Sequence, residues 1–237
     1  VRRRIGYVFG GDRGLYERLS ALDNLRYFAE LYAVPAREQR ARIGELLELV
    51  GLSGRERERV EGFSRGMRQR LHIARGLLHD PDLLFLDEPS IGIDPVGARE
   101  LRQTIAGLRE QGKTILLTTH YMFEADELCD RIAVIRQGEL VATGTPAELK
   151  ARVSAGSVLE VEVFDALGDR LAIVEALPGV RSSTMTTGET SQTLVVSVDA
   201  GADVTGATLD ALHGIRVGRV VTRQPTLEDA YVELVGS

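Results

Sequence analysis

The sequence is poor in several residue types, and each shortage excludes a class of protein. It contains one cysteine, Cys129, so an intramolecular disulfide is excluded and the chain fits a reducing compartment. No apolar run approaches the roughly 18 residues that cross a bilayer, so no membrane-spanning segment is predicted. Lysine occurs only as Lys113 and Lys150. Any phosphate-binding motif that depends on lysine must therefore use one of these two residues.

What remains is an ordinary globular composition. The 237 residues are 43% hydrophobic and 27% charged, which predicts one large domain or two modest ones. The formal net charge of −6 argues against a general nucleic-acid binder. The first residue is Val1 rather than methionine, and we expect further sequence upstream of it.

The charge is unevenly distributed along the chain. Residues 155–237 hold five arginines and twelve acidic residues, a balance of −7, which leaves the preceding residues near +1. This change follows a Gly-Thr-Pro turn and a short helical segment. It predicts a domain boundary around Val153–Gly156, with one domain over residues 1–153 and a second over 156–237.

The first domain shows an α/β pattern. Apolar runs at Arg4–Phe9, Leu83–Leu86 and Ile115–Leu117 predict strands, and we expect Leu83–Leu86 to be buried on both faces of a parallel sheet. Amphipathic spacing predicts helices between them, and a hairpin is expected about Gln137-Gly138. His72 and His79, on or at the end of one such helix, are expected at the surface.

The second domain has a different order of elements. Its apolar pattern predicts β-α-β-β-α-β, followed by a last helix that begins near Thr226. This is the pattern of small ferredoxin-like α+β domains, and the predicted segments are 158–164, 171–177, 180–185, 193–198, 204–212 and 216–222.

The strongest chemical signal is a pair of carboxylates that follows an apolar strand. Asp87 and Glu88 end the run Leu83–Leu86, at the carboxyl edge of a parallel sheet where ligands bind. An aspartate there can hold Mg²⁺, and the following glutamate can orient an attacking water. His120 closes the next strand, so it is predicted at the same edge as Glu88, where it can donate a hydrogen bond to a terminal phosphate.

Two further segments carry weaker signals. Asp94-Pro95 is an N-cap followed by a first-turn proline, which is common without any function. Ser64 and Gly66 begin a basic helix, and an open helix N-terminus with its positive dipole suits a phosphate.

Taken together, these residues resemble the nucleotide-binding subunit of ATP-binding cassette (ABC) transporters, over Arg3 to about Arg152. Phe63–Met67 resembles the family's signature loop, Leu83–Glu88 its Walker B strand, Ser90–Asp94 its D-loop, and His120 its switch histidine. The C-terminal part resembles the extension of ATPases that serve drug and polyketide exporters.

The resemblance implies a P-loop NTPase-type fold with a helical subdomain at about 20–78 and an N-terminally truncated sheet. It also implies roles for single residues. Glu88 and His120 act in hydrolysis and Asp87 holds Mg²⁺, while Asp94 belongs to the nucleotide site. Ser64 and Gly66 bind the ATP of a partner subunit.

Three departures from the family pattern stand out. The signature loop has Phe63, Arg65 and Met67 in place of Leu, Gly and Gln, a variant associated with the exporter branch. Gly10-Gly11 replace the usual Q-loop glutamine. The Walker A loop, expected before Arg2, is not present in this chain.

One segment imitates the missing loop. Gly107–Thr114 matches G-x-x-x-x-G-K-T residue for residue. A phosphate-binding loop runs from strand to helix, whereas this segment is predicted to run from helix to strand. The negative end of a helix would repel a nucleotide, so we interpret Gly112 as a helix-ending residue, with Lys113 beside the last carbonyls.

The resulting hypothesis is an ATP-binding subunit of an exporter that binds ATP and Mg²⁺. It acts as a homodimer or with a paired cassette subunit, beneath an integral-membrane permease, on the cytoplasmic face of the cell membrane, and without nucleic acid. Two alternatives remain: a catalytically inactive or regulatory cassette subunit, and a soluble ABC ATPase that does not transport. The transported substrate cannot be predicted, because selectivity resides in the permease.

Overall fold

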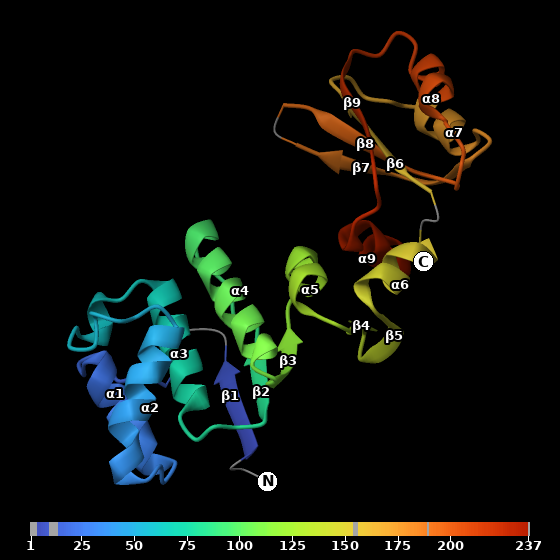
Figure 1. Ribbon diagram of the computed structural model, residues 1–237. Helices are drawn as coiled ribbons and strands as arrows, with labels where there is room; N and C mark the ends of the chain where they lie inside the picture. The colour runs from blue at the N-terminus through green and yellow to red at the C-terminus, as the bar shows by residue number, and fades with distance from the viewer. Residues whose placement is uncertain (1–3, 10–13, 154–155, 189, 237) are drawn as a thin grey trace. The chain divides into compact units, whose positions relative to one another are not determined.

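The computed structural model describes residues 4–9, 14–153, 156–188 and 190–236, and the chain divides into two compact units. The N-terminal unit ends at Leu128 and the C-terminal unit begins at Cys129. Each unit has its own sheets and helices (Figure 1). Gly10 and Gly11, the expected Q-loop positions, lie outside the described residues.

A three-stranded parallel sheet organises the N-terminal unit. Its strands are β1 (Ile5–Phe9), β2 (Leu83–Asp87) and β3 (Thr114–Thr118), in that spatial order. The register places Phe9, Asp87 and Thr118 in one row across the sheet. The predicted parallel arrangement is therefore confirmed, and β2 lies between its two neighbours. The unit's helices are α1 (Ala21–Leu31), α2 (Ala36–Leu49), α3 (Arg65–Leu77), α4 (Pro95–Glu110) and α5 (Met122–Leu128), with a 3₁₀ turn at Val60–Gly62.

Helix α3 covers one face of this sheet at very short range. A side chain at Gly6 would place its Cβ 2.5 Å from the carbonyl oxygen of Gly76 on α3. Glycine at both positions allows the helix and the strand to approach closely. On this face Leu84 and Leu86 are fully buried.

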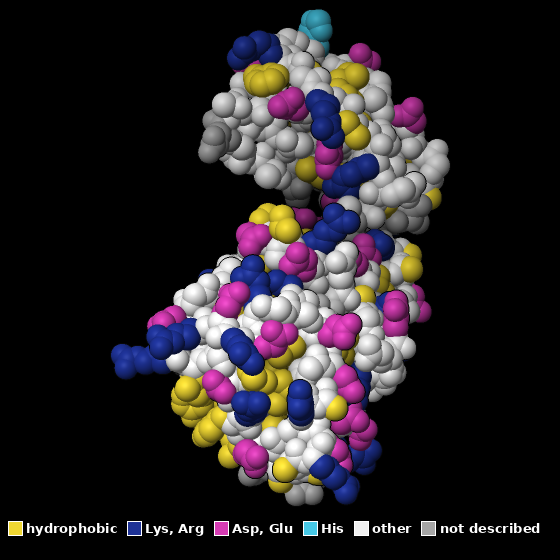
Figure 2. Space-filling model, turned by 60° about the vertical axis from the view of Figure 1, so that its left-hand side comes forward, with side chains coloured by type: hydrophobic (Ala, Val, Ile, Leu, Met, Phe, Trp, Pro, Cys, Tyr) yellow, Lys and Arg dark blue, Asp and Glu magenta, His cyan; other side chains and the backbone are white. Residues whose placement is uncertain are grey.

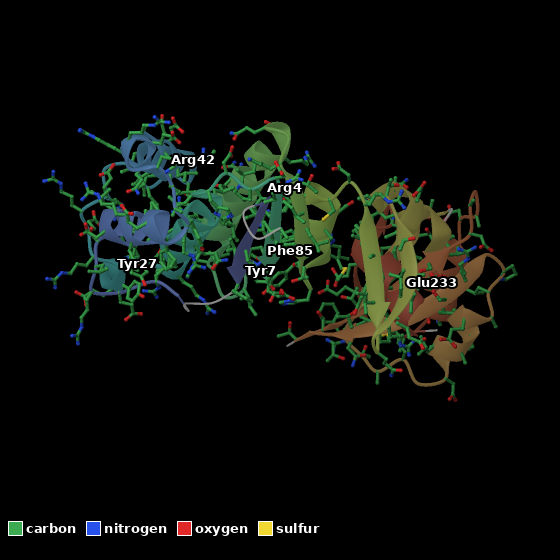
Figure 3. The ribbon with its side chains drawn as sticks, turned by 90° about the horizontal axis from the view of Figure 1, so that it is seen from below. Arg4, Tyr7, Tyr27, Arg42, Phe85 and Glu233 are labelled. Atoms are coloured by element: carbon green, nitrogen blue, oxygen red, sulfur yellow. The ribbon has the colours of Figure 1, made fainter. Side chains whose placement is uncertain are left out.

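The opposite face of the sheet corrects one prediction. Leu83–Leu86 was expected to be buried on both faces, but within the described residues only the α3 side is covered. Tyr7 and Leu116 are 42% and 53% exposed, and the rings of Tyr7 and Phe85 stack with centroids 5.8 Å apart (Figure 3). For the residues that the structure describes, burial on both faces of the sheet is therefore not observed.

Helix α3 also corrects the expectation that His72 lies at the surface. His72 is 1% exposed, and nine of the thirteen residues of α3 are buried. The helix is buried because α1, α2 and α4 pack around it in addition to β1. His79, just beyond the helix, is half-buried, and one of its ring nitrogens lies 3.0 Å from the carbonyl oxygen of Ile5.

The C-terminal unit begins with the predicted hairpin. Strands β4 (Ile132–Arg136) and β5 (Glu139–Gly144) pair antiparallel about Gln137 and Gly138, which both have positive φ. This backbone suits a tight two-residue hairpin turn. Helix α6 (Pro146–Val153) follows and packs against the final helix, α9 (Leu227–Gly236). Residues 129–153 therefore group with the C-terminal unit, and the predicted boundary at Val153–Gly156 stays a prediction.

The remainder of this unit has the predicted β-α-β-β-α-β order. Its four-stranded antiparallel sheet has the spatial order β7-β8-β6-β9 (Figure 1), which is the split βαβ arrangement of ferredoxin-like domains. Alternate residues of β6 and β8 form the core with helices α7 and α8. The bounds are β6 (Val158–Val163), α7 (Arg170–Glu175), β7 (Val180–Thr187), β8 (Gln192–Val198), α8 (Thr205–Ala211) and β9 (Val217–Arg223).

None of the helices built from the described residues combines the length and the apolar character that crossing a membrane requires.

Candidate functional site

The ends of β2 and β3 bring together three of the predicted site residues. A ring nitrogen of His120, Nδ1, lies 2.7 Å from Oε2 of Glu88. Thr118, the last residue of β3, donates its hydroxyl hydrogen to Oδ1 of Asp87, the last residue of β2, at 2.5 Å. Both contacts cross between neighbouring parallel strands, so the sheet itself fixes the spacing of these groups. The sequence prediction that Glu88 and His120 share this edge agrees with this geometry.

The backbone of Glu88 is unusual in a way that serves this arrangement. Its φ is +47°, a left-handed conformation that residues other than glycine adopt at a cost. Its N–H donates to the carbonyl oxygen and to the hydroxyl of Thr118, both at 3.1 Å. These hydrogen bonds hold a sharp turn of the chain after Asp87. The carboxylates of Asp87 and Glu88 therefore both lie at the carboxyl edge of the sheet.

Thr118 is a site residue that sequence reasoning missed. Its hydroxyl accepts from the Glu88 N–H and donates to the Asp87 carboxylate, so one side chain orients both carboxylate residues. A threonine at the end of a strand is too common to signal this role. The feature that identifies Thr118 is its position in the sheet register, where it lies directly beside Asp87.

Glu124 is a second residue that the sequence analysis did not predict, and it acts on the segment around His120. Glu124 on α5 is 1% exposed, and its Oε2 accepts a hydrogen bond of 2.9 Å from the hydroxyl of Thr119. The same hydroxyl accepts the N–H of Tyr121, whose ring centroid lies 4.1 Å from that of His120. Residues 119 and 121 are thereby held on both sides of His120, which itself stays exposed.

The residues predicted for the signature loop and the D-loop form a second group, in contact with each other. Ser64 caps α3 by accepting the Met67 N–H at 3.2 Å, and Asp94 caps α4 by accepting from Val96 and Gly97. A Cβ built on Gly66 would lie 3.2 Å from the methyl of Ile93. The start of α3 therefore packs directly against the D-loop of the same chain.

Gly92, in the predicted D-loop, lies against Arg65 of the predicted signature loop. Gly92 has φ +68°, and a Cβ there would lie 2.0 Å from the guanidinium of Arg65. The positive φ favours glycine at this position, whereas the guanidinium is the far end of a flexible side chain and can move away from a methyl group. Across the described residues, no hydrogen bond or ion pair joins Ser64 or Asp94 to Glu88 or His120, so one chain holds two separate groups of predicted site residues.

The segment Gly107–Thr114 runs from helix to strand, as predicted. Gly112 has φ +84°, and its N–H donates to the carbonyl of Arg109 while that of Lys113 donates to Leu108. These two hydrogen bonds form a Schellman motif, which commonly ends helices. The Lys113 ammonium does not lie at the last carbonyls of α4 but contacts Oδ1 of Asp80 at 2.7 Å, and this bond lowers the pKa of Asp80. Lys113 therefore forms an ion pair with Asp80 within the N-terminal unit.

Asp87 fits a role in holding Mg²⁺. Magnesium usually takes one or two carboxylates and completes its shell with waters and substrate phosphates. Within the part of the chain that the structure describes, no cluster of three or more His, Cys, Asp or Glu is placed to hold a metal ion. The Asp87 carboxylate is oriented by Thr118 and stands at the sheet edge, as this mode of binding requires.

The parallel sheet and the residues at its edge define the class of protein: a P-loop NTPase-type ATP-binding domain. A model of the ABC transporter family matches residues 1–91. LnrL of Bacillus subtilis strain 168, a linearmycin resistance ATP-binding protein, is 34% identical over 243 residues, covering 100% of this chain and 76% of LnrL. DrrA3 of Streptomyces coeruleorubidus, a daunorubicin resistance ATP-binding protein, is 39% identical over 241 residues, covering 100% of this chain and 73% of DrrA3.

A solved structure agrees with these relatives. That of cbiO1 from Clostridium perfringens, described as part of the ABC transporter complex cbiONQ, has a TM-score of 0.59 and 30% identity, covering 63% of this chain and 60% of cbiO1. The chain therefore belongs to the ATP-binding proteins of ABC transporters. Members of this family are ATPases whose hydrolysis is coupled to transport, and the predicted family and fold class are confirmed.

Proposed function

We propose that this chain is the ATPase subunit of an exporter, in which Glu88 and His120 carry out hydrolysis at the carboxyl edge of the sheet. The observation that carries the proposal is the 2.7 Å contact between these two side chains, held by neighbouring strands. The names of LnrL and DrrA3, both resistance ATP-binding proteins, support efflux as the direction of transport.

The proposed chemistry assigns one task to each group. The Glu88 carboxylate orients the attacking water and accepts its proton, and His120 positions that carboxylate and donates a hydrogen bond toward the terminal phosphate. Asp87, oriented by Thr118, would hold Mg²⁺, which when bound neutralises charge on the phosphates. An intact Glu88–His120 pair favours this reading over an inactive subunit.

We further propose that two chains complete each site. Ser64 and Gly66 lie in a group separate from Glu88 and His120, and an N-terminus of α3 that faces a partner's nucleotide would bring the two groups together. The close packing of Gly66 on Ile93 links the signature loop to Asp94, so the D-loop would carry the state of one site to the other.

A complementation experiment tests both parts of this proposal, in a chain that carries a Walker A segment ahead of Val1. Ser64→Arg blocks the signature loop and Glu88→Gln blocks hydrolysis, so each variant alone should be inactive. A mixture should regain turnover, because one site of each mixed dimer combines an intact Glu88 with an intact Ser64. A mixture that stays inactive, although mixed dimers form, would contradict a site shared between two chains.

An exposed aromatic surface on the N-terminal unit supports a permease as the partner, and a position for the chain at the inner face of the membrane. Tyr16, Tyr27 and Leu31 are 47%, 46% and 63% exposed, and the rings of Tyr16 and Tyr27 meet edge to face at 5.0 Å. Figure 2, which brings the side of α1 and α2 forward, shows hydrophobic side chains gathered among the charged ones. Surfaces of this kind mark interaction sites.

A photo-crosslinking amino acid at position 27 tests this contact in native membranes. We expect a crosslink to an integral-membrane protein identified by mass spectrometry. The same group at Ala41, an exposed position on α2, is the control and should give none. Equal crosslinking from both positions would remove the support for this surface.

A further inference from the structure

The C-terminal unit contains a cavity of about 510 Å³ that none of the functions above uses. It lies on the face of the ferredoxin-like sheet that turns away from α7 and α8. Leu159, Val161 and Leu194 point into the core beneath those helices, and the residues that alternate with them line the cavity instead. Helix α9 supplies the opposite wall.

The lining combines hydroxyl groups with a small apolar surface. Ser182 and Thr184 of β7 lie directly across from Ser197 and Val195 of β8 in the sheet register, and all four line the cavity. Val232 of α9 adds a second apolar group. The lining is thus mostly polar and charged, with Val195 and Val232 as a small apolar contact, and its volume is within the range of sites that bind small molecules.

An arginine fixes one end of the cavity and satisfies two of its carboxylates. Arg223 donates to Oε1 of Glu160 at 2.7 Å and to both oxygens of Asp229 at 2.9 and 2.6 Å. Burial alone would raise the pKa of Asp229, but the hydrogen bonds from Arg223 and Thr226 outweigh it and hold this pKa below its usual range. These groups are therefore committed to one another.

Glu233 is different, because its Oε2 is buried and has no hydrogen-bond partner. It lies on α9, in the C-terminal unit (Figure 3), and is one of the residues that line the cavity. A buried carboxylate oxygen without a donor is costly, and such groups are found where a ligand supplies the missing donor. Four carboxylates and one arginine line the cavity, so its charge is negative and favours a cation.

We propose that this cavity binds a small organic amine, whose ammonium group donates to Glu233. The apolar body of the amine would lie against Val195 and Val232, and its polar substituents would bond the hydroxyls of Ser182 and Ser197. A metal ion fits less well, because no cluster of metal-ligating side chains occurs among the residues that the structure describes. The inference is independent of the ATPase site.

Fluorescence titration of the 237-residue chain with dansylcadaverine, a primary amine that carries an aromatic fluorophore, tests the proposal. We expect saturable binding to the parent with a dissociation constant below about 1 mM. The affinity of Glu233→Gln should be lower by roughly tenfold or more, because a charge-assisted hydrogen bond is lost. Asp210→Asn is the matched control: it removes the same charge from an exposed position on α8 and should bind as the parent does. The N-butyl dansylamide, which lacks the amine, should bind as weakly as the amine binds to Glu233→Gln.

A second variant, Thr184→Trp, fills the cavity from an exposed strand position and should abolish binding while circular dichroism shows an intact fold. Equal affinity of Glu233→Gln and the parent would overturn the proposal. So would equal binding of the amine and the neutral probe, binding that survives Thr184→Trp, or the absence of saturable binding to the parent.

Discussion

Arg223 joins the last helix to the sheet of the C-terminal unit, and its removal should destabilise that unit. Three short hydrogen bonds tie it to Glu160 and Asp229, whose side chains are 28% and 15% exposed. Hydrogen bonds to charged groups contribute about 1.5–3 kcal/mol, and breaking a fully buried ion pair costs about 3–5 kcal/mol. Because Arg223 keeps 28% exposure and water can replace part of its contacts, we expect Arg223→Met to cost about 2–3 kcal/mol.

Hydrogen exchange read by mass spectrometry measures this loss within the intact chain. Peptides from residues 227–236 should exchange faster by the factor that corresponds to that free energy, and urea unfolding should shift in the same direction. Arg219→Met is the control, since Arg219 is exposed and should change stability by less than about 0.5 kcal/mol. A change of that small size in Arg223→Met would refute the reasoning.

The same ion pair predicts a pH dependence with a definite sign. The pKa of Asp229 is lower in the folded chain than its ordinary value. The contribution is therefore fully present above the ordinary pKa, near 4, and is lost as pH falls through the folded pKa. The free energy of unfolding of the parent should therefore decrease as the pH falls over that range, and the Arg223→Met variant should lose less stability over the same range.

Three further predictions concern Lys113, Gly92 and the binding of Mg-ATP. Lys113→Met should cost about 0.5–1.5 kcal/mol by removing the contact with Asp80, yet leave Mg-ATP affinity unchanged in a chain that carries a Walker A loop, as calorimetry would show. A tenfold loss of affinity would mean that this lysine meets the nucleotide. Gly92→Ala should cost about 1 kcal/mol or more in thermal unfolding, whereas Gly107→Ala, in an open helical position, should be neutral or stabilising. Residues 1–237 alone should bind no Mg-ATP at micromolar concentrations in a calorimetric titration, because they contain no Walker A loop.

The sequence predicted the sheet edge well because local patterns determine it. Apolar runs mark β2 and β3, and polar residues follow both, so the placement of Glu88 beside His120 needed only the assumption that these strands are parallel neighbours. The order of the C-terminal elements was equally legible, since each segment has a clear period. Periodicity also separated the Gly107–Thr114 segment from a true phosphate-binding loop.

What the sequence did not reveal depends on three-dimensional packing. The burial of His72 follows from the number of elements around α3, which no local pattern reports. The open face of the sheet at Tyr7 reflects which elements cover it rather than the strand's own residues. Thr118 and Arg65 act through partners about 30 residues away, and only the structure brings these partners together.

Steady-state phosphate release is the measurement that tests the central claim most directly. The assay compares the parent, Glu88→Gln and the exposed control Glu110→Gln, all in a chain that carries a Walker A segment ahead of Val1. We expect Glu88→Gln to lose about 10²–10⁴ in turnover with Mg-ATP affinity retained, and Glu110→Gln to match the parent. Turnover near the parent level in Glu88→Gln would contradict the assignment of hydrolysis to this edge of the sheet.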